Sequence, residues 1–188
     1  IKKIIFSSSC TIYGQGEKCP INENFPYKPI NPYGNTKMFS EILIEDYANI
    51  KKDFHAISLR YFNPVGANFL KGLSESPLGK PLNIMPSIMD AVYKKKPLTV
   101  YGDDYQTYDG TCIRDYVHVS DVAEAHIKAL KKITKAKGHE KINIGLGKGI
   151  SVLKLIKIFE KANKVKVPYV IGKRRDGDIA KAYAYNKK

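Results

Sequence analysis

The chain has 188 residues, enough for a domain with a substantial core, and 43% hydrophobic with 27% charged residues is typical of a globular protein. No run approaches the roughly 18 apolar residues of a membrane span, and no signal peptide is visible, so we expect no membrane partner. The net charge of +14 would suit nucleic acid, but the lysines are scattered or lie at expected helix ends. We therefore expect a solvated lysine-rich surface and no nucleic-acid partner.

The cysteines and histidines show no ligand or disulfide pattern. The three cysteines, Cys10, Cys19 and Cys112, contain no Cys-x-x-Cys pair, and the four histidines lack metal-ligand spacing. Unpaired cysteines fit a reducing compartment. We expect a cytoplasmic protein without a metal site.

The first predicted element is a buried parallel strand over residues 2–6, a short apolar run. Ser7, Ser8 and Ser9 follow it directly. Ligands of open α/β sheets bind beyond the carboxyl ends of such strands, so the serines are candidate site residues. An ordinary polar loop would begin in the same way.

A Tyr-x-x-x-Lys motif lies at the N-terminal end of the next predicted element, a helix. Apolar residues over 37–50 recur at helical spacing, and Pro32 prevents a helix before it. Tyr33 and Lys37 are four residues apart, so in a helix they share one face. Because a nearby cation favours a phenolate, Tyr33 is a candidate general base, although this motif also occurs often by chance.

The remaining segments alternate between strand and helix patterns, which indicates an α/β fold with right-handed crossovers. Further strands are predicted over residues 54–61, 98–101, 113–119, 141–145 and, as the last, 167–171. Helices are predicted over residues 85–93, 122–134 and 152–162, with Ser120 and Ser151 as the caps of the last two.

Five segments in order resemble one family and together extend over nearly the whole chain. Residues 7–14, 31–37 and 60–67 resemble the extended short-chain dehydrogenases that act on nucleotide sugars. Residues 103–119 and 174–178 narrow the resemblance to the UDP-glucose 4-epimerase family. The resemblance implies the second part of a Rossmann-like, doubly wound parallel sheet plus a smaller α/β substrate-binding domain.

The expected domain division follows from this resemblance. Residues 1–67 would be the C-terminal part of the NAD-binding domain, and residues 68–188 mainly the UDP-sugar-binding domain, with about 113–135 returning to the Rossmann core. The family's glycine-rich NAD-binding start is not found in this chain, and the glycines at 145–149 come late with the wrong spacing. The chain alone is therefore expected to be inactive.

The resemblance implies NAD as cofactor and a UDP-hexose as substrate, with roles for individual residues. Tyr33 is similar to the catalytic base, Lys37 to the residue that tunes it and holds the nicotinamide ribose, and Ser9 to the proton relay. The expected NAD-binding residues are Tyr33, Lys37, Phe62 and Ser7. The expected substrate-binding residues are Asn63, Asn83, Tyr101, Arg114, Tyr116, Arg175, Asp178 and Ala182.

The chemistry of these side chains agrees with such roles. Arginines such as Arg114 and Arg175 bind phosphate bidentately, an aromatic face suits uracil, and a carboxylate such as Asp178 accepts from ribose hydroxyls. Each of these side chains could also have a purely structural role; Arg114, for example, could form a surface ion pair with Asp115. Ala182 stands four residues after Asp178, where a small side chain in this family admits N-acetylated sugars. A one-residue slip would place the bulky Tyr183 there instead.

The implied reaction interconverts UDP-glucose and UDP-galactose, in galactose metabolism, through a 4-keto sugar, with N-acetylhexosamine counterparts as further substrates. Alternatives are a non-catalytic UDP-sugar-binding fragment, a decarboxylase or a dehydratase of the same fold. A dehydratase usually needs an Asp-Glu pair where Cys10 and Thr11 stand. Because the family often dimerises through the helix that carries Tyr-x-x-x-Lys, we expect a homodimer of the full-length protein.

Overall fold

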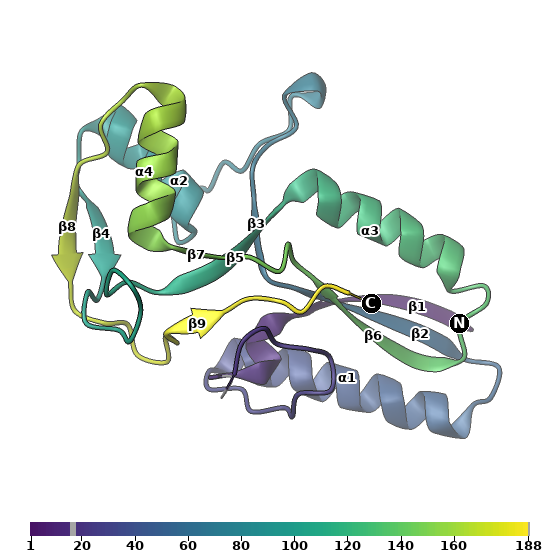
Figure 1. The fold of residues 1–188 in the computed structure, drawn as a ribbon. Coiled ribbons are helices and arrows are strands. Elements are labelled where there is room, and N and C mark those ends of the chain that lie inside the picture. The colour runs from purple at the N-terminus through teal and green to yellow at the C-terminus, as the bar shows by residue number, and fades with distance from the viewer. Residues whose placement is uncertain (16–17, 188) are drawn as a thin grey trace.

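The computed structural model describes residues 1–15 and 18–187 and contains a parallel three-stranded sheet as its first layer (Figure 1). The strand order is β1-β2-β6. These strands are β1 (Lys3–Ser9), β2 (His55–Tyr61) and β6 (Gly138–Ile144). The middle strand, β2, is buried along almost its whole length, as expected for a parallel strand that is covered on both faces.

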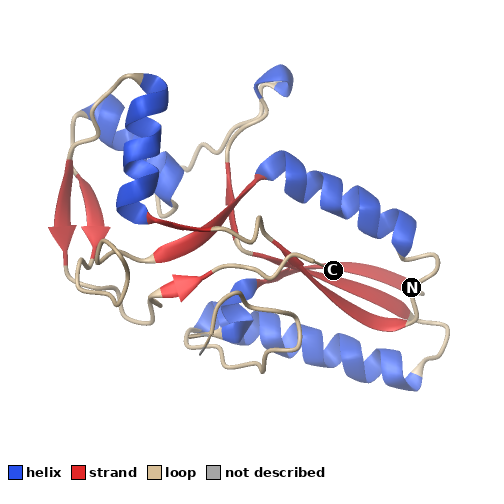
Figure 2. Ribbon diagram, viewed as in Figure 1, coloured by secondary structure: helices blue, strands red, loops and turns tan. Residues whose placement is uncertain are grey.

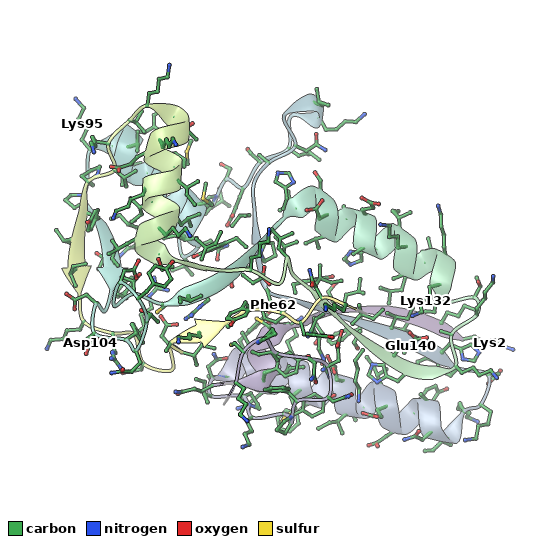
Figure 3. The ribbon with its side chains drawn as sticks, in the orientation of Figure 1. Lys2, Phe62, Lys95, Asp104, Lys132 and Glu140 are labelled. Carbon is green, nitrogen blue, oxygen red and sulfur yellow. The ribbon has the colours of Figure 1, made fainter. Side chains whose placement is uncertain are left out.

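Two helices cover the opposite faces of this sheet (Figure 1). Helix α1 (Pro32–Ile50) packs on one face and α3 (Val119–Lys132) on the other. Under α3 the core is apolar and includes Ile57, Leu59 and Ile133. The far end of α3 is joined to β6 by an ion pair between Lys132 and Glu140, both labelled in Figure 3 (2.6 Å).

The other strands form two smaller sheets beside the first (Figure 2). Strand β5 (Ile113–His118) pairs with three short strands: β3 (Asn63–Val65), β7 (Gly149–Ser151) and β9 (Lys181–Ala182). Strands β4 (Leu98–Tyr101) and β8 (Tyr169–Gly172) form a parallel pair. Helices α2 (Ile84–Lys94) and α4 (Val152–Asn163) cover that pair, and two 3₁₀ turns, η1 (Cys10–Tyr13) and η2 (Phe69–Lys71), complete the elements.

The α/β class is confirmed, but several predicted boundaries were wrong. Helix α1 does begin at Pro32, before which no helix was expected, and Asn31 caps it by accepting a hydrogen bond from the Gly34 amide (2.8 Å). Proline suits the first helical position, since its missing N–H would have no partner in the helix. Helix α3 begins earlier than predicted, and its cap is His118 rather than Ser120.

The C-terminal strands differ from the prediction as well. Strand β8 covers residues 169–172 instead of 167–171, and it is not the last strand, because β9 follows it. The predicted cap of α4 is confirmed: the Ser151 hydroxyl accepts from the Lys154 amide (3.2 Å).

The glycine-containing turn after β6 is bound to a buried carboxylate. Asp115 of β5 accepts hydrogen bonds from the amides of Leu146 (2.8 Å), Gly147 (2.9 Å) and Ala184 (3.0 Å). This carboxylate therefore holds the turn next to β5 and the segment after β9.

Two kinds of feature are absent from residues 1–15 and 18–187. None of the helices there is long and apolar enough to cross a membrane. The same residues contain no group of three His, Cys, Asp or Glu side chains placed to hold a metal ion.

Candidate functional site

The serines at the carboxyl end of β1 are fixed by local hydrogen bonds. Ser9 is buried and caps η1: its hydroxyl oxygen accepts from the amide (3.2 Å) and the hydroxyl (3.0 Å) of Thr11. Both bonds use the oxygen of Ser9 as acceptor, so its own proton can be given to another group. Ser9 is thus a polar side chain held in one place at the edge of the sheet.

Tyr33 and Lys37 lie on the first turns of α1, next to the end of β1. The ammonium of Lys37 donates to the carbonyl oxygen of Ser7 (3.0 Å) and lies 5.6 Å from the centre of the Tyr33 ring. Tyr33 is 54% exposed, so its phenol is open to a ligand. The structure therefore brings the start of α1 to the carboxyl end of β1, as the motif predicted.

A glycine allows this close approach. A Cβ atom on Gly34 would lie 2.8 Å from the carbonyl oxygen of Thr11 and 2.9 Å from Pro29. The first turn of α1 therefore packs against η1, the turn that follows Ser9, at a distance that leaves no room for a larger residue.

The other two expected NAD-binding residues lie nearby, in different surroundings. The Ser7 hydroxyl accepts from the phenol of Tyr61 (3.0 Å), a phenol that also lies 2.7 Å from His126 Nε2. Burial raises the pKa of Tyr61, so its proton is retained. Phe62, labelled in Figure 3, is buried in a cluster with Tyr13 and Ala182.

Most of the expected substrate-binding residues line one cleft. The cleft has a volume of about 910 Å³, within the range of small-molecule sites. Seven of the eight residues line it: Asn63, Asn83, Tyr101, Arg114, Tyr116, Arg175 and Asp178. Because Asn63 follows β2 by two residues, the cleft reaches the carboxyl edge of the first sheet, where Ser9 lies.

The cationic side chains of the cleft have specific partners. Arg114 forms an ion pair with Asp178 rather than with Asp115, whose carboxylate binds backbone amides instead. The guanidinium of Arg175 lies 3.9 Å from the centre of the Tyr101 ring. Each expected diphosphate-binding arginine therefore lies beside another expected substrate residue. Arg114 contacts Asp178, expected at the ribose, and Arg175 contacts Tyr101, expected at the uracil.

Further cleft residues were missed by sequence reasoning. Lys80, Lys94 and Lys96 line the cleft, although Lys94 and Lys96 had looked like ordinary helix-end residues. Cys112 also lines it, and its thiol contacts Asp178 (3.6 Å). Burial raises the pKa of Cys112, which keeps it a neutral thiol. No sequence signal distinguished these residues, because strands and helices distant in sequence bring them together.

The remaining cleft residues belong to neighbouring elements. Asn63 and Tyr116 are paired across β3 and β5, and burial raises the pKa of Tyr116 to about 12, so it is a neutral phenol. Asn83 precedes α2 without capping it, and its amide nitrogen donates to Glu75 (2.6 Å).

Ala182 lies outside the residues that line the cleft. It is buried on β9 in the cluster that also contains Phe62 and Tyr13. The next residue, Tyr183, lies against Gly149, where an added Cβ would meet the Tyr183 ring at 2.9 Å. Since neighbouring residues of a strand point to opposite faces, Ala182 rather than Tyr183 is directed toward the cluster of Phe62.

The parallel sheet thus carries the Tyr-x-x-x-Lys motif at its carboxyl edge and has an arginine-lined cleft beside it. Residues 1–145 match the model of the NAD dependent epimerase/dehydratase family, and the chain belongs to that family.

Several relatives are similar over almost the whole chain. The UDP-glucose 4-epimerase of Bacillus subtilis is 46% identical over 185 residues, which are 98% of this chain and 55% of that protein. A structure of UDP-glucose 4-epimerase from Bifidobacterium longum in complex with NAD⁺ and UDP has a TM-score of 0.94 and 45% identity, covering 100% of this chain and 56% of that one.

A second solved structure is equally similar. It is UDP-glucose 4-epimerase from Stenotrophomonas maltophila with bound NAD and formylated UDP-arabinopyranose, with a TM-score of 0.94 and 44% identity over 98% of this chain and 55% of that one. The chain thus spans about half the length of the relatives that it matches.

Proposed function

We propose that the full-length protein interconverts UDP-glucose and UDP-galactose through a 4-keto sugar, with NAD as cofactor. The observation that carries the proposal is the meeting of two sites. Seven expected substrate-binding residues line one cleft, and one of them, Asn63, follows the end of β2, which is paired with the end of β1 at Ser9, beside Lys37 and Tyr33. The names of the similar proteins, which are UDP-glucose 4-epimerases, agree with it.

The residues at the start of α1 fit the nicotinamide end of NAD. The Lys37 ammonium is held by the Ser7 carbonyl beside the exposed Tyr33, an arrangement that leaves donors and an acceptor for a ribose diol. When bound, NAD supplies a reversible hydride acceptor for C4 of the sugar. In this proposal Tyr33, Lys37, Ser7 and Phe62 hold and orient it.

The chain's own residues carry the proton and the binding steps. Tyr33 takes the proton of the sugar 4-hydroxyl, through or beside Ser9, and returns it to the 4-oxygen after the sugar has turned. Arg114 and Arg175 hold the diphosphate, and Lys80 and Lys96 add positive charge to the same cleft, whereas Lys94 is paired with Asp90 (2.8 Å). Tyr101 would stack on uracil. Asp178 would accept from the ribose hydroxyls, and Asn63 and Asn83 would bind the diphosphate.

We also propose the domain division given by the resemblance. Residues 1–67 with the segment of about 113–135 would form the cofactor-binding part, and the rest mainly the UDP-sugar part. The packing of α3 on the first sheet supports the return of that segment. The free thiols of Cys10, Cys19 and Cys112 support a reducing, cytoplasmic location.

A homodimer of the full-length protein is the proposed assembly. Helix α1 exposes an apolar face of large side chains, and the spacing of its residues places them on one stripe. They are Phe39, Leu43, Tyr47 and Ile50. A second copy of this helix would cover that stripe.

A wider substrate range is the second candidate function, and Ala182 favours it. Its methyl group points toward the cluster of Phe62, whereas Tyr183 points to the Gly149 side. In this proposal the small side chain leaves space for an N-acetyl group on the hexose.

The direct test is to incubate the full-length protein with UDP-galactose and to follow UDP-glucose by chromatography. The account predicts conversion to an equilibrium mixture. If UDP binds but no hexose is converted, the protein is a binding module. Release of CO₂ from UDP-glucuronic acid would identify a decarboxylase instead.

A further inference from the structure

A buried ion pair lies directly behind the proposed catalytic residues. Glu41 of α1 and Arg60 of β2 are 0% and 1% exposed. Arg60 Nε donates to both carboxylate oxygens of Glu41 (3.0 and 3.2 Å), and Arg60 Nη2 donates to Glu41 Oε2 (2.5 Å). Burial alone would raise the pKa of Glu41, but its bonds to Arg60, Ser8 and Tyr27 lower it below its usual value, so the carboxylate is charged.

Glu41 extends the helix face that carries the proposed base. Tyr33, Lys37 and Glu41 are spaced by four residues and therefore follow one another along one side of α1. Glu41 Oε1 accepts from the hydroxyl of Ser8 (2.5 Å), the residue just before Ser9. The helix is thus bonded to β1 at the position next to the proposed proton relay.

Arg60 binds the other end of the same segment. Ser8 and Arg60 are paired across β1 and β2. Arg60 Nη1 donates to the phenol of Tyr13 (2.7 Å), the last residue of η1, and that phenol donates to Asn143 on β6 (2.7 Å). The six residues from Ser8 to Tyr13 are therefore held at both ends by one ion pair, and Ser9 lies between the two attachment points.

Stability alone is a weak reason for such a pair. The desolvation of two buried charges offsets much of their attraction, and apolar replacements of similar volume are often as stable. A side chain that must stay at one distance from a partner on another element needs fixed attachments, and charge-assisted hydrogen bonds provide them.

We propose that Glu41 and Arg60 are positioning residues, which hold Ser9 at the distance from Tyr33 that proton transfer needs. This inference rests on the proposed function. A displacement of about 1 Å costs on the order of 100-fold in rate. Loosening the attachments slows turnover, whereas binding of UDP, which takes place in the arginine-lined cleft, is unchanged.

The test uses the full-length protein and begins with Ser8→Ala, which removes one bond to Glu41 and leaves the ion pair in place. We expect kcat to fall about 10- to 100-fold with KM for UDP-galactose within about twofold. Ser40→Ala is the matched control, because the Ser40 hydroxyl donates to the Thr36 carbonyl of its own helix (2.9 Å), and we expect wild-type kcat. Wild-type kcat in Ser8→Ala would overturn the proposal.

A double variant separates positioning from stability. In Glu41→Met with Arg60→Met, both charges are replaced by apolar side chains, so we expect a melting temperature near that of the wild type and a kcat at least as low as in Ser8→Ala. Recovery of both stability and turnover would show that the pair is only structural. Ser8→Ala decides the question if the double variant does not fold.

Amide hydrogen exchange tests the attachment without relying on turnover. We expect Ser8→Ala to speed exchange at residues 9–13, while α1 keeps wild-type protection. Unchanged exchange at residues 9–13 would overturn the proposal. If the wild type does not convert UDP-galactose, the proposed function fails, and the exchange result still decides whether this pair fixes the Ser9 segment.

Discussion

At the scale of single residues, the candidate site places the exposed Tyr33 beside Lys37, and the buried ion pair of Glu41 and Arg60 lies behind them. Tyr33 and Lys37 could be predicted because helical spacing alone places them on one face. Arg60 stood within an apolar strand pattern, and a buried charge requires a partner. That partner, Glu41, lies 19 residues away on another element, and no periodicity links the two. The ion pair therefore could not be predicted.

Replacing Tyr33 by Phe in the full-length protein removes the phenol proton and keeps the ring. We expect kcat for UDP-galactose to fall by about 10²–10⁴-fold, the usual contribution of a general acid or base. UDP and NAD binding, measured by calorimetry, should stay close to wild type. Turnover at the wild-type rate would show that another group is the base.

The change Ala182→Tyr tests the wider substrate range. Ala182 is buried beside Phe62, and forcing extra volume into a filled site costs about 1–3 kcal/mol. We expect UDP-N-acetylglucosamine turnover to fall about 10- to 100-fold, while UDP-glucose turnover is retained. Tyr183→Ala is the comparison variant. If Tyr183→Ala widens the substrate range and Ala182→Tyr changes nothing, then Tyr183 rather than Ala182 stands at the hexose position.

At the scale of elements, long periodic segments were predictable and short strands were not. Helices α2 and α4 were predicted within one or two residues of their ends. Strands β3, β7 and β9 have three, three and two residues, too few to show an alternating pattern, and they form only by pairing with β5. The start of α1 at Pro32 is set by the cap at Asn31, a contact that the apolar periodicity over residues 37–50 does not reveal.

The change Gly34→Ala tests the contact between α1 and η1. Alanine favours the helix by about 0.5–1 kcal/mol over glycine, but overpacking costs about 1–3 kcal/mol. Because the added Cβ would lie 2.8 Å from the Thr11 carbonyl, we expect a net loss of stability in chemical denaturation and a lower kcat. Asn35→Ala, at the exposed neighbouring position, should be neutral; equal stability of both variants would contradict the described packing.

At the scale of the whole molecule, the net charge was predicted to be a dispersed surface charge, yet part of it lines the cleft. Lys80, Lys94 and Lys96 lie there beside Arg114 and Arg175. Their side chains come from loops, from the end of α2 and from strand β5, which meet only in the folded chain. The cleft itself therefore could not be predicted from sequence patterns. The seven expected substrate-binding residues that line it were identified through the family resemblance.

The apolar stripe of α1 predicts the assembly of the full-length protein. Leu43→Lys places a charge in the middle of that stripe, where Leu43 is 69% exposed. Because a buried unpaired charge is strongly unfavourable, we expect a monomer in sedimentation velocity. Asn49→Lys adds the same charge to this helix outside the stripe, and that variant should remain a dimer. If the wild-type protein sediments as a monomer, the proposed assembly is wrong.

The most direct test of the central claim follows a deuterium at C4 of UDP-galactose through the reaction of the full-length protein. If oxidation and re-reduction occur at one carbon, the label leaves C4 and returns to its opposite face. The account therefore predicts UDP-glucose that retains deuterium at C4, measured by NMR. Loss of the label to solvent would contradict it.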